Sequence, residues 1–197
     1  MAAELLIKAL QSIWQSLSAM DVPAAVMGGL AMSFWKYTRS TRDVDLLIGV
    51  DVQKSDKILS QFRSIGIRPK QTPPVISLGQ LNIIQLLYEP PDAYMEVQID
   101  LLLAESDYHR TALERRMPTR LPDLPMDIAI LTCEDLILHK LLAGRLIDRA
   151  DVAALIKFNF ASLDRNYLAL WTKRLQITAE FASVWEEILP DEPLPIG

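Results

Sequence analysis

Several residue types are scarce in this chain, and each scarcity excludes a class of protein. The 197 residues include one cysteine, Cys133, so no disulfide can form within the chain. With only His109 and His139 beside it, no Cys/His set can build a structural zinc site. No run of about 18 consecutive apolar residues occurs, because the most apolar stretch, from Val26 to Trp35, stops at Lys36. We therefore expect no membrane contact and a reducing, cytoplasmic setting.

An excess of basic residues is also missing. Twenty Lys and Arg stand against 25 Asp and Glu, so the formal net charge is −5, which argues against coating nucleic acid by net charge alone. Half of the residues are hydrophobic, which is enough for a sizeable core. The length predicts one core with at most a small appendage.

The order of patterns along the chain predicts an α+β fold. An amphipathic helix at 3–20 is followed by a strand at 24–27, a strand at 43–48, and strands at 81–88, 95–103 and 126–131. We expect about four or five strands in a small mixed sheet flanked by helices. After residue 131 every segment has helical spacing, so we predict a core at 1–131 and an all-helical C-terminal region at 132–197 packed on it.

Glycine is used sparingly, yet two of the seven stand together as Gly28 and Gly29 between a predicted strand and a predicted helix. Such a turn lets backbone N–H groups approach an anion at a helix N-terminus. For the pair in isolation, a tight turn beneath a packed helix is the favoured explanation.

Three acids interrupt predicted apolar strands. Asp43 and Asp45 are two residues apart, so in a strand their side chains project to the same side, and Asp100 lies within a second strand. Carboxylates are rarely buried without compensation, and a divalent cation such as Mg²⁺ satisfies several of them at once. Pairing of Asp43 and Asp45 with Arg39 and Arg42 is the alternative.

These motifs together resemble the polymerase-β-type nucleotidyltransferase superfamily: Gly28-Gly29, thirteen residues, Asp43-Val44-Asp45, and a later strand acid at Asp100. More narrowly, two groups of motifs are similar to the AbiEii-like toxin nucleotidyltransferases. The first group is 28–32 (GGLAM) with 39–45 (RSTRDVD). The second is 134–137 (EDLI) with Lys140 and 145–151 (RLIDRAD). The match spans roughly residues 24 to 156. Leu30 stands where the superfamily commonly has serine, so that hydroxyl contact to phosphate is missing.

The resemblance implies an enzyme that moves a nucleoside monophosphate from an NTP to an acceptor hydroxyl with Mg²⁺ or Mn²⁺. It implies that Asp43, Asp45 and Asp100 are catalytic and hold the metal. The residues expected to bind the nucleotide are Gly28, Gly29, Arg42, Lys140 and Asp148. Periodicity alone favours a solvated helix residue at Lys140, and Asp148 could simply be a first-turn helix acid.

Acceptor and partners follow from the same resemblance. A toxin-like enzyme would modify RNA, such as the tRNA end, and would have a cognate antitoxin protein. Two alternatives are a small-molecule enzyme of the antibiotic-modifying type and a non-catalytic nucleotide-binding protein of the same fold. Basic residues at 110, 115, 116 and 120 either guide an acidic acceptor or form a solvated helix face.

Overall fold

The computed structural model describes residues 2–78, 81–91, 93–121 and 124–195. The last two residues of the predicted helical region, 196 and 197, lie outside the described residues. Contacts between Cα atoms divide the chain into two compact units. The first comprises Met1–Ala31 and Ser40–Leu131, and the second comprises Met32–Arg39 and Thr132–Gly197. Among the described residues, no helix combines the length and the apolar character needed to cross a membrane.

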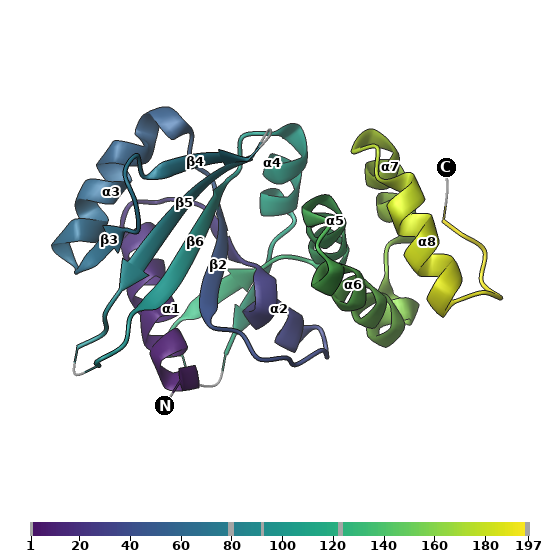
Figure 1. Ribbon diagram of the computed structural model, residues 1–197, viewed down its shortest axis with the longest axis horizontal. Coiled ribbons are helices and arrows are strands. Elements are labelled where there is room, and N and C mark those ends of the chain that lie inside the picture. Colours follow the sequence, from purple (N-terminus) through teal and green to yellow (C-terminus); the bar gives the residue numbers. More distant parts are fainter. Residues whose placement is uncertain (1, 79–80, 92, 122–123, 196–197) are drawn as a thin grey trace. The chain divides into compact units, whose positions relative to one another are not determined.

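The first unit is built on a mixed sheet of eight strands (Figure 1). Their order is β3-β5-β6-β2-β1-β8-β7, and β4 pairs with β5 outside this path. β2 runs parallel to β6, and β1 runs parallel to β8, whereas the other neighbours are antiparallel. The strands are β1 (Ala24–Val26), β2 (Asp43–Ile48), β3 (Ile67–Pro69), β4 (Val75–Leu78), β5 (Leu81–Tyr88), β6 (Val97–Leu103), β7 (Met117–Arg120) and β8 (Asp127–Ile130).

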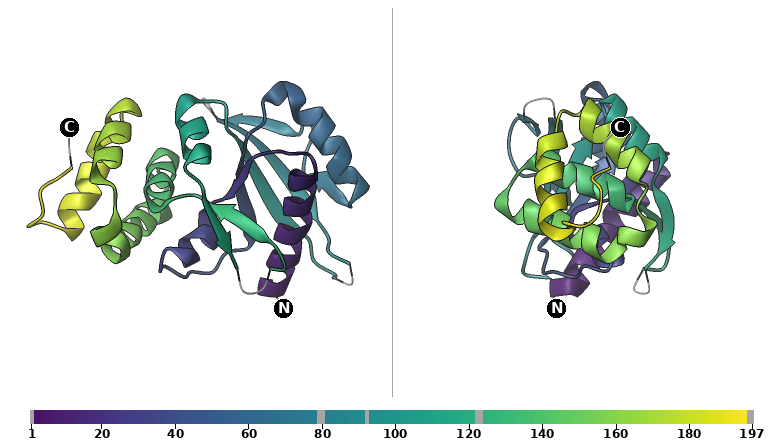
Figure 2. Two further views of the ribbon diagram at one scale, coloured as in Figure 1. Left: turned by 180° about the vertical axis from the view of Figure 1, so that it is seen from behind. Right: turned by 90° about the vertical axis from the view of Figure 1, so that its right-hand side faces the viewer.

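One face of this sheet is buried beneath α1 (Ala2–Ala19), which packs on β2 and β6 and also on α3 (Ser55–Ser64). Figure 2 (left) shows α1 in front of the strands on this side. Leu10, Ile13 and Leu17 of α1 are almost completely buried at helical spacing. Val44 and Ile99 are completely buried, and because strand side chains alternate, their neighbours project to the other face. That face therefore receives the strand acids, and we call it the open face.

Three short helical segments complete the elements of the first unit. The 3₁₀ turn η1 (Val52–Lys54) leads into α3, and α4 (Asp107–Glu114) follows β6. Ser106 begins α4, because its side-chain oxygen accepts a hydrogen bond from the backbone N–H of His109. The third segment, α2 (Gly28–Phe34), begins directly after β1, and its residues from 32 onward group with the second unit.

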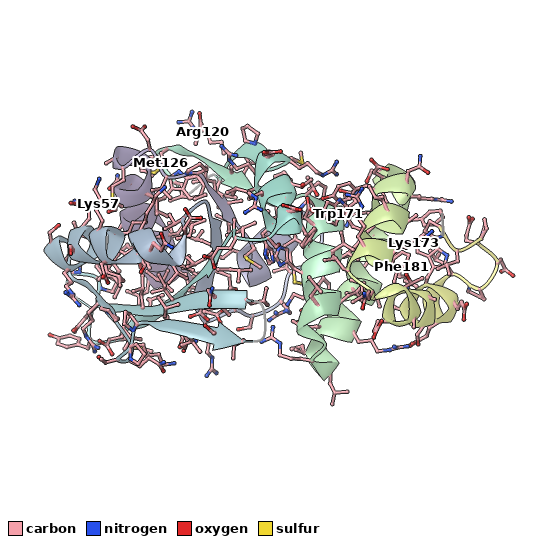
Figure 3. The ribbon with its side chains drawn as sticks, turned by 90° about the horizontal axis from the view of Figure 1, so that it is seen from above. Lys57, Arg120, Met126, Trp171, Lys173 and Phe181 are labelled. Carbon is pink, nitrogen blue, oxygen red and sulfur yellow. The ribbon has the colours of Figure 1, made fainter. Side chains whose placement is uncertain are left out.

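The second unit is helical, with α5 (Cys133–Ala143), α6 (Leu146–Asn159), the 3₁₀ turn η2 (Phe160–Ser162), α7 (Arg165–Arg174) and α8 (Thr178–Ile188). Thr132 begins α5, since its side chain accepts from the backbone N–H of Asp135. Trp171 of α7 and Phe181 of α8, both labelled in Figure 3, are buried in this unit, and Trp185 is completely buried. Aromatic packing thus forms the core between these helices.

The mixed sheet flanked by helices and the helical second half are confirmed, but the expected strand count was wrong. The eight-stranded sheet includes β3 and β7, each of which contains a proline, Pro69 and Pro118. Both strands are edges of the sheet, where proline is tolerated because an edge strand pairs on one side only. The prolines explain why β3 and β7 were not predicted, and β4 is the third strand that the sequence patterns missed.

Candidate active site

The register of two parallel strands brings the three predicted acids together on the open face. β2 and β6 pair so that Asp45 lies directly opposite Asp100, and Asp43 is two residues earlier on the same face. Carboxylate oxygens from all three lie within 4.8 Å of one another, and each residue is half-buried. We call these residues the acid trio.

Asp100 accepts hydrogen bonds from two glutamine side chains. Gln98 Nε2 donates to both carboxylate oxygens, at 2.9 and 3.0 Å, and Gln85 Nε2 lies 3.4 Å from one of them. Burial raises the pKa of Asp100 above its usual range, the Gln98 hydrogen bond opposes this, and the charge of Asp43 raises it further. The ionised trio is therefore costly without a positive charge beside it.

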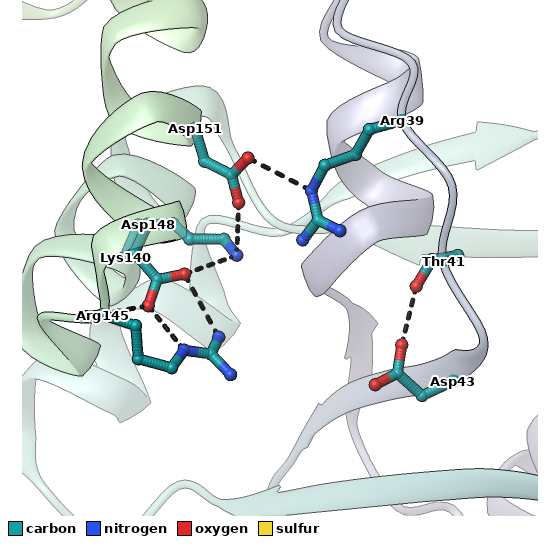
Figure 4. A network of polar contacts seen from close by, with 7 residues as sticks. All are labelled: Arg39, Thr41, Asp43, Lys140, Arg145, Asp148 and Asp151. Atoms are coloured by element: carbon teal, nitrogen blue, oxygen red, sulfur yellow. Dashed lines mark hydrogen bonds and ion pairs between the residues drawn. The ribbon is translucent and has the colours of Figure 1, made fainter.

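Asp43 is oriented by the residue two positions before it. The Thr41 hydroxyl donates to Asp43 Oδ1 at 2.6 Å (Figure 4). Arg42, between them, is exposed to solvent. Sequence reasoning missed both Thr41 and Gln98, although each lies two positions from an acid. For Gln98, within a strand, that spacing alone places the side chain on the same face as Asp100.

Close approach requires glycine at both positions of the turn, and at Gly28 the backbone conformation requires it as well. Gly28 has a φ of +61°, and a Cβ added there would lie 1.8 Å from Asp45 Oδ2. A Cβ on Gly29 would lie 2.6 Å from the Cβ of Thr41. The backbone N–H of Met27 also donates to the carbonyl of Asp45 at 2.9 Å. The diglycine turn is thus packed directly against the acid trio.

The donor set fits a hard divalent cation. Carboxylate oxygens are the ligands that Mg²⁺ prefers, and those of the acid trio lie within 4.8 Å of one another. Two ions about 3.5–4 Å apart are also compatible with three carboxylates. Mn²⁺ takes the same oxygen ligands. The acid trio is therefore suited to hold Mg²⁺ or Mn²⁺.

Lys140 and Asp148, both predicted to bind nucleotide, lie in a buried ionic cluster of the second unit (Figure 4). Lys140 Nζ lies 2.9 Å from Asp148 Oδ1 and 2.8 Å from Asp151 Oδ2. Arg145 Nε pairs with Asp148 at 2.7 Å, and Arg39 Nε pairs with Asp151 at 3.1 Å. We call these five residues the ionic cluster.

The three central side chains of the ionic cluster are almost completely buried. The side chains of Asp148 and Asp151 are 1% exposed and that of Lys140 is 8% exposed. Burial alone would raise the pKa of Asp148, but hydrogen bonds from Arg145 and Lys140 outweigh it and lower that pKa. A phosphate group approaching Lys140 would have to compete with two carboxylates, so the cluster has a structural role in its own right.

Comparison with known proteins gives the fold. No family model and no curated protein matches the chain. The nucleotidyltransferase-like antigenic protein from Paracoccidioides brasiliensis is 19% identical, with a TM-score of 0.50 over 94% of this chain and 97% of that one. The antibiotic-resistance factor ANT(2'')-Ia is 13% identical, with a TM-score of 0.56 over 95% and 98%. JHP933 from Helicobacter pylori is 16% identical, with a TM-score of 0.50 over 98% and 83%.

These likenesses define a fold class. The chain has a nucleotidyltransferase-like fold, in which a mixed sheet flanked by helices positions the acid trio on its open face. The narrower resemblance to the AbiEii-like toxins rests on the sequence motifs alone.

Proposed function

We propose that this protein is a divalent-metal-dependent nucleotidyltransferase that transfers a nucleoside monophosphate from an NTP to an acceptor hydroxyl. The observation that supports this proposal most is the convergence of carboxylate oxygens from Asp43, Asp45 and Asp100 within 4.8 Å of one another. These acids lie beside the diglycine turn, where close approach leaves no room for a Cβ. The nucleotidyltransferase-like fold is consistent with this chemistry.

In the proposed reaction, the acceptor oxygen forms a bond to the α-phosphorus of the NTP while the bond from that phosphorus to the bridging oxygen breaks, releasing pyrophosphate. Asp43 and Asp45 hold the cation, and Asp100 either completes its ligand set or accepts the proton of the acceptor hydroxyl. A bound Mg²⁺ or Mn²⁺ supplies neutralisation of phosphate charge. Catalysis then depends mainly on positioning and electrostatics.

The roles given to the remaining residues are part of this proposal. Backbone N–H groups at Gly28 and Gly29 would cradle the triphosphate, and the exposed Arg42 would pair with phosphate oxygens. Nucleotide contacts by Lys140 and Asp148 remain predictions, because their partners in the structure are one another and the rest of the ionic cluster.

For the acceptor we propose RNA, in particular the tRNA end, with the enzyme acting as the toxin of a toxin–antitoxin pair in the cytoplasm. The AbiEii-like motifs support this choice. Incubating the protein with each α-labelled NTP, Mg²⁺ and total RNA tests it, and the expected result is label that migrates with RNA. Co-expression with the protein encoded next to it would reveal an antitoxin as a suppressor of that labelling.

A small-molecule acceptor of the antibiotic type is the second candidate. It is favoured by the net charge of −5, which disfavours polyanion binding, and by the structural likeness to ANT(2'')-Ia over nearly the whole of both chains. Label found in a small-molecule fraction, with RNA unlabelled, would select this candidate. Binding of NTP without any label transfer would instead indicate a non-catalytic nucleotide-binding protein.

A further inference from the structure

A line of polar contacts leads from a surface lysine to the acid trio. Lys70 is exposed and directly follows the edge strand β3. Its backbone N–H donates to the carbonyl of Gln85 at 2.9 Å, which ties this residue to β5. Its ammonium group donates to Gln98 Oε1 at 2.7 Å. Lys70 is thus held against the sheet at two points.

The contact with Lys70 fixes which way the Gln98 amide points. An ammonium group can only donate, so the amide oxygen must face Lys70. The amide NH₂ then faces the other way, toward Asp100, where it donates to both carboxylate oxygens. The reversed amide would place a donor against the ammonium and an acceptor against the carboxylate. Lys70 therefore selects the orientation in which Gln98 can support Asp100.

Gln98 also lies where it can orient Asp100 toward the other two acids. In the β2–β6 register its Cα is opposite that of Asp43, two residues from Asp100 on the open face. A carboxylate offers about four lone-pair sites, so Asp100 retains acceptor capacity for a cation after both oxygens accept from Gln98. The hydrogen bonds restrict rotation of the carboxylate without filling its ligand positions.

We propose that Lys70 and Gln98 are positioning residues that orient the Asp100 carboxylate toward Asp43 and Asp45 and thereby set the affinity of the acid trio for a divalent cation. This inference rests on the proposed function, because it needs the acid trio to be the metal site. Groups that orient metal ligands in this way typically change metal affinity 10- to 100-fold when they are removed.

Direct Mn²⁺ binding to the protein, followed by electron paramagnetic resonance without any nucleotide, tests the proposal apart from turnover. We expect Gln98→Met to weaken Mn²⁺ binding about 10-fold or more. Lys70→Met should weaken it less, about two- to fivefold, because Lys70 acts only through Gln98 and because removing a positive charge near the acid trio by itself favours cation binding. Lys70→Arg should restore most of the affinity. Gln61→Met, which changes an exposed glutamine on α3, is the matched control and should bind as the wild type does.

The same binding measurements distinguish a failure of the positioning role of Lys70 and Gln98 from a failure of the metal site itself. Wild-type affinity in both Gln98→Met and Lys70→Met, with binding lost in Asp45→Asn, would overturn the positioning role and leave the metal site standing. Wild-type affinity in Asp45→Asn would overturn the metal site itself. Thermal unfolding checks that each variant is folded, and if Gln98→Met is not, the exposed pair Lys70→Met and Lys70→Arg decides.

Discussion

Gly28 and Asp45 are packed so closely that the position of a Cβ on Gly28 falls 1.8 Å from the carboxylate oxygen Oδ2 of Asp45. The two residues come from different elements, the first turn of α2 and the middle of β2. Their separation is too small for any side chain at position 28. The glycine is therefore required by the Asp45 carboxylate as much as by its own φ of +61°.

We expect Gly28→Ala to displace the Asp45 carboxylate and to reduce nucleotidyl transfer at least about 100-fold, because misplacement of a reacting group by about 1 Å has effects of that size. The stability cost should be on the order of 1–3 kcal/mol from the left-handed backbone alone. Steady-state transfer assays and urea unfolding measure the two effects separately.

Gly66→Ala is the matched control for this change. Gly66 has a φ of +79°, and the nearest atom to an added Cβ, Tyr88 Cε2, is 4.0 Å away. It should show the stability cost with full transfer activity. Equal activity in Gly28→Ala and Gly66→Ala would contradict the close packing of the turn against the acid trio.

Asp100→Asn should raise the free energy of unfolding of the metal-free protein at pH 7. The pKa of Asp100 is raised in the folded state, so the folded protein holds this proton more tightly and loses stability as pH rises through that range. Removing the charge removes the penalty. The advantage of the variant over the wild type should shrink as the pH is lowered toward the ordinary aspartate pKa.

Urea unfolding in the presence of EDTA, repeated from pH 4 to pH 8, measures this difference. Asp56→Asn, in the exposed first turn of α3, is the control and should change stability by no more than about 0.5 kcal/mol at any pH. An Asp100→Asn protein that is less stable than the wild type at pH 7 would contradict the electrostatic cost that we assign to the acid trio.

Lys140→Met should destabilise the protein by about 3 kcal/mol, because it leaves two buried carboxylates without their shared cation. Arg145 still pairs with Asp148, and Arg39 still pairs with Asp151. The loss of stability should therefore lie at the lower end of the range for breaking a buried ion pair. Lys157→Met, on the exposed side of α6, is the control and should change stability by less than about 0.5 kcal/mol. Equal stability in the two variants would show that the ionic cluster contributes nothing.

Much of the site was predictable because its signals are local. The bounds of β2, Asp43–Ile48, agree with prediction, since an apolar run interrupted by two acids at strand spacing is an unusual pattern. The sequence placed each acid inside a strand and the resemblance implied a shared metal site, but neither gave the pairing of the two strands. The parallel register of β2 and β6, with Asp45 opposite Asp100, supplies that pairing.

What escaped prediction depends on contacts distant in sequence. Lys70 acts on Gln98 across 28 residues, and Arg39 reaches Asp151 across 112, so no periodicity connects either pair. The partners of Lys140 were hidden for a related reason: on one helix a lysine beside leucines looks the same whether it faces water or buried aspartates. The phosphate role that the resemblance implies for this residue stays a prediction, and the structure adds the two carboxylates with which it pairs.

Transfer of label from α-labelled NTP reports directly on whether the acid trio is a catalytic metal site. The wild type should transfer label to its acceptor only when Mg²⁺ or Mn²⁺ is present, and Asp43→Asn and Asp45→Asn should each lose at least about 1,000-fold of this activity while remaining folded. Transfer at the wild-type rate by either folded variant would contradict the assignment of the acid trio as the catalytic metal site.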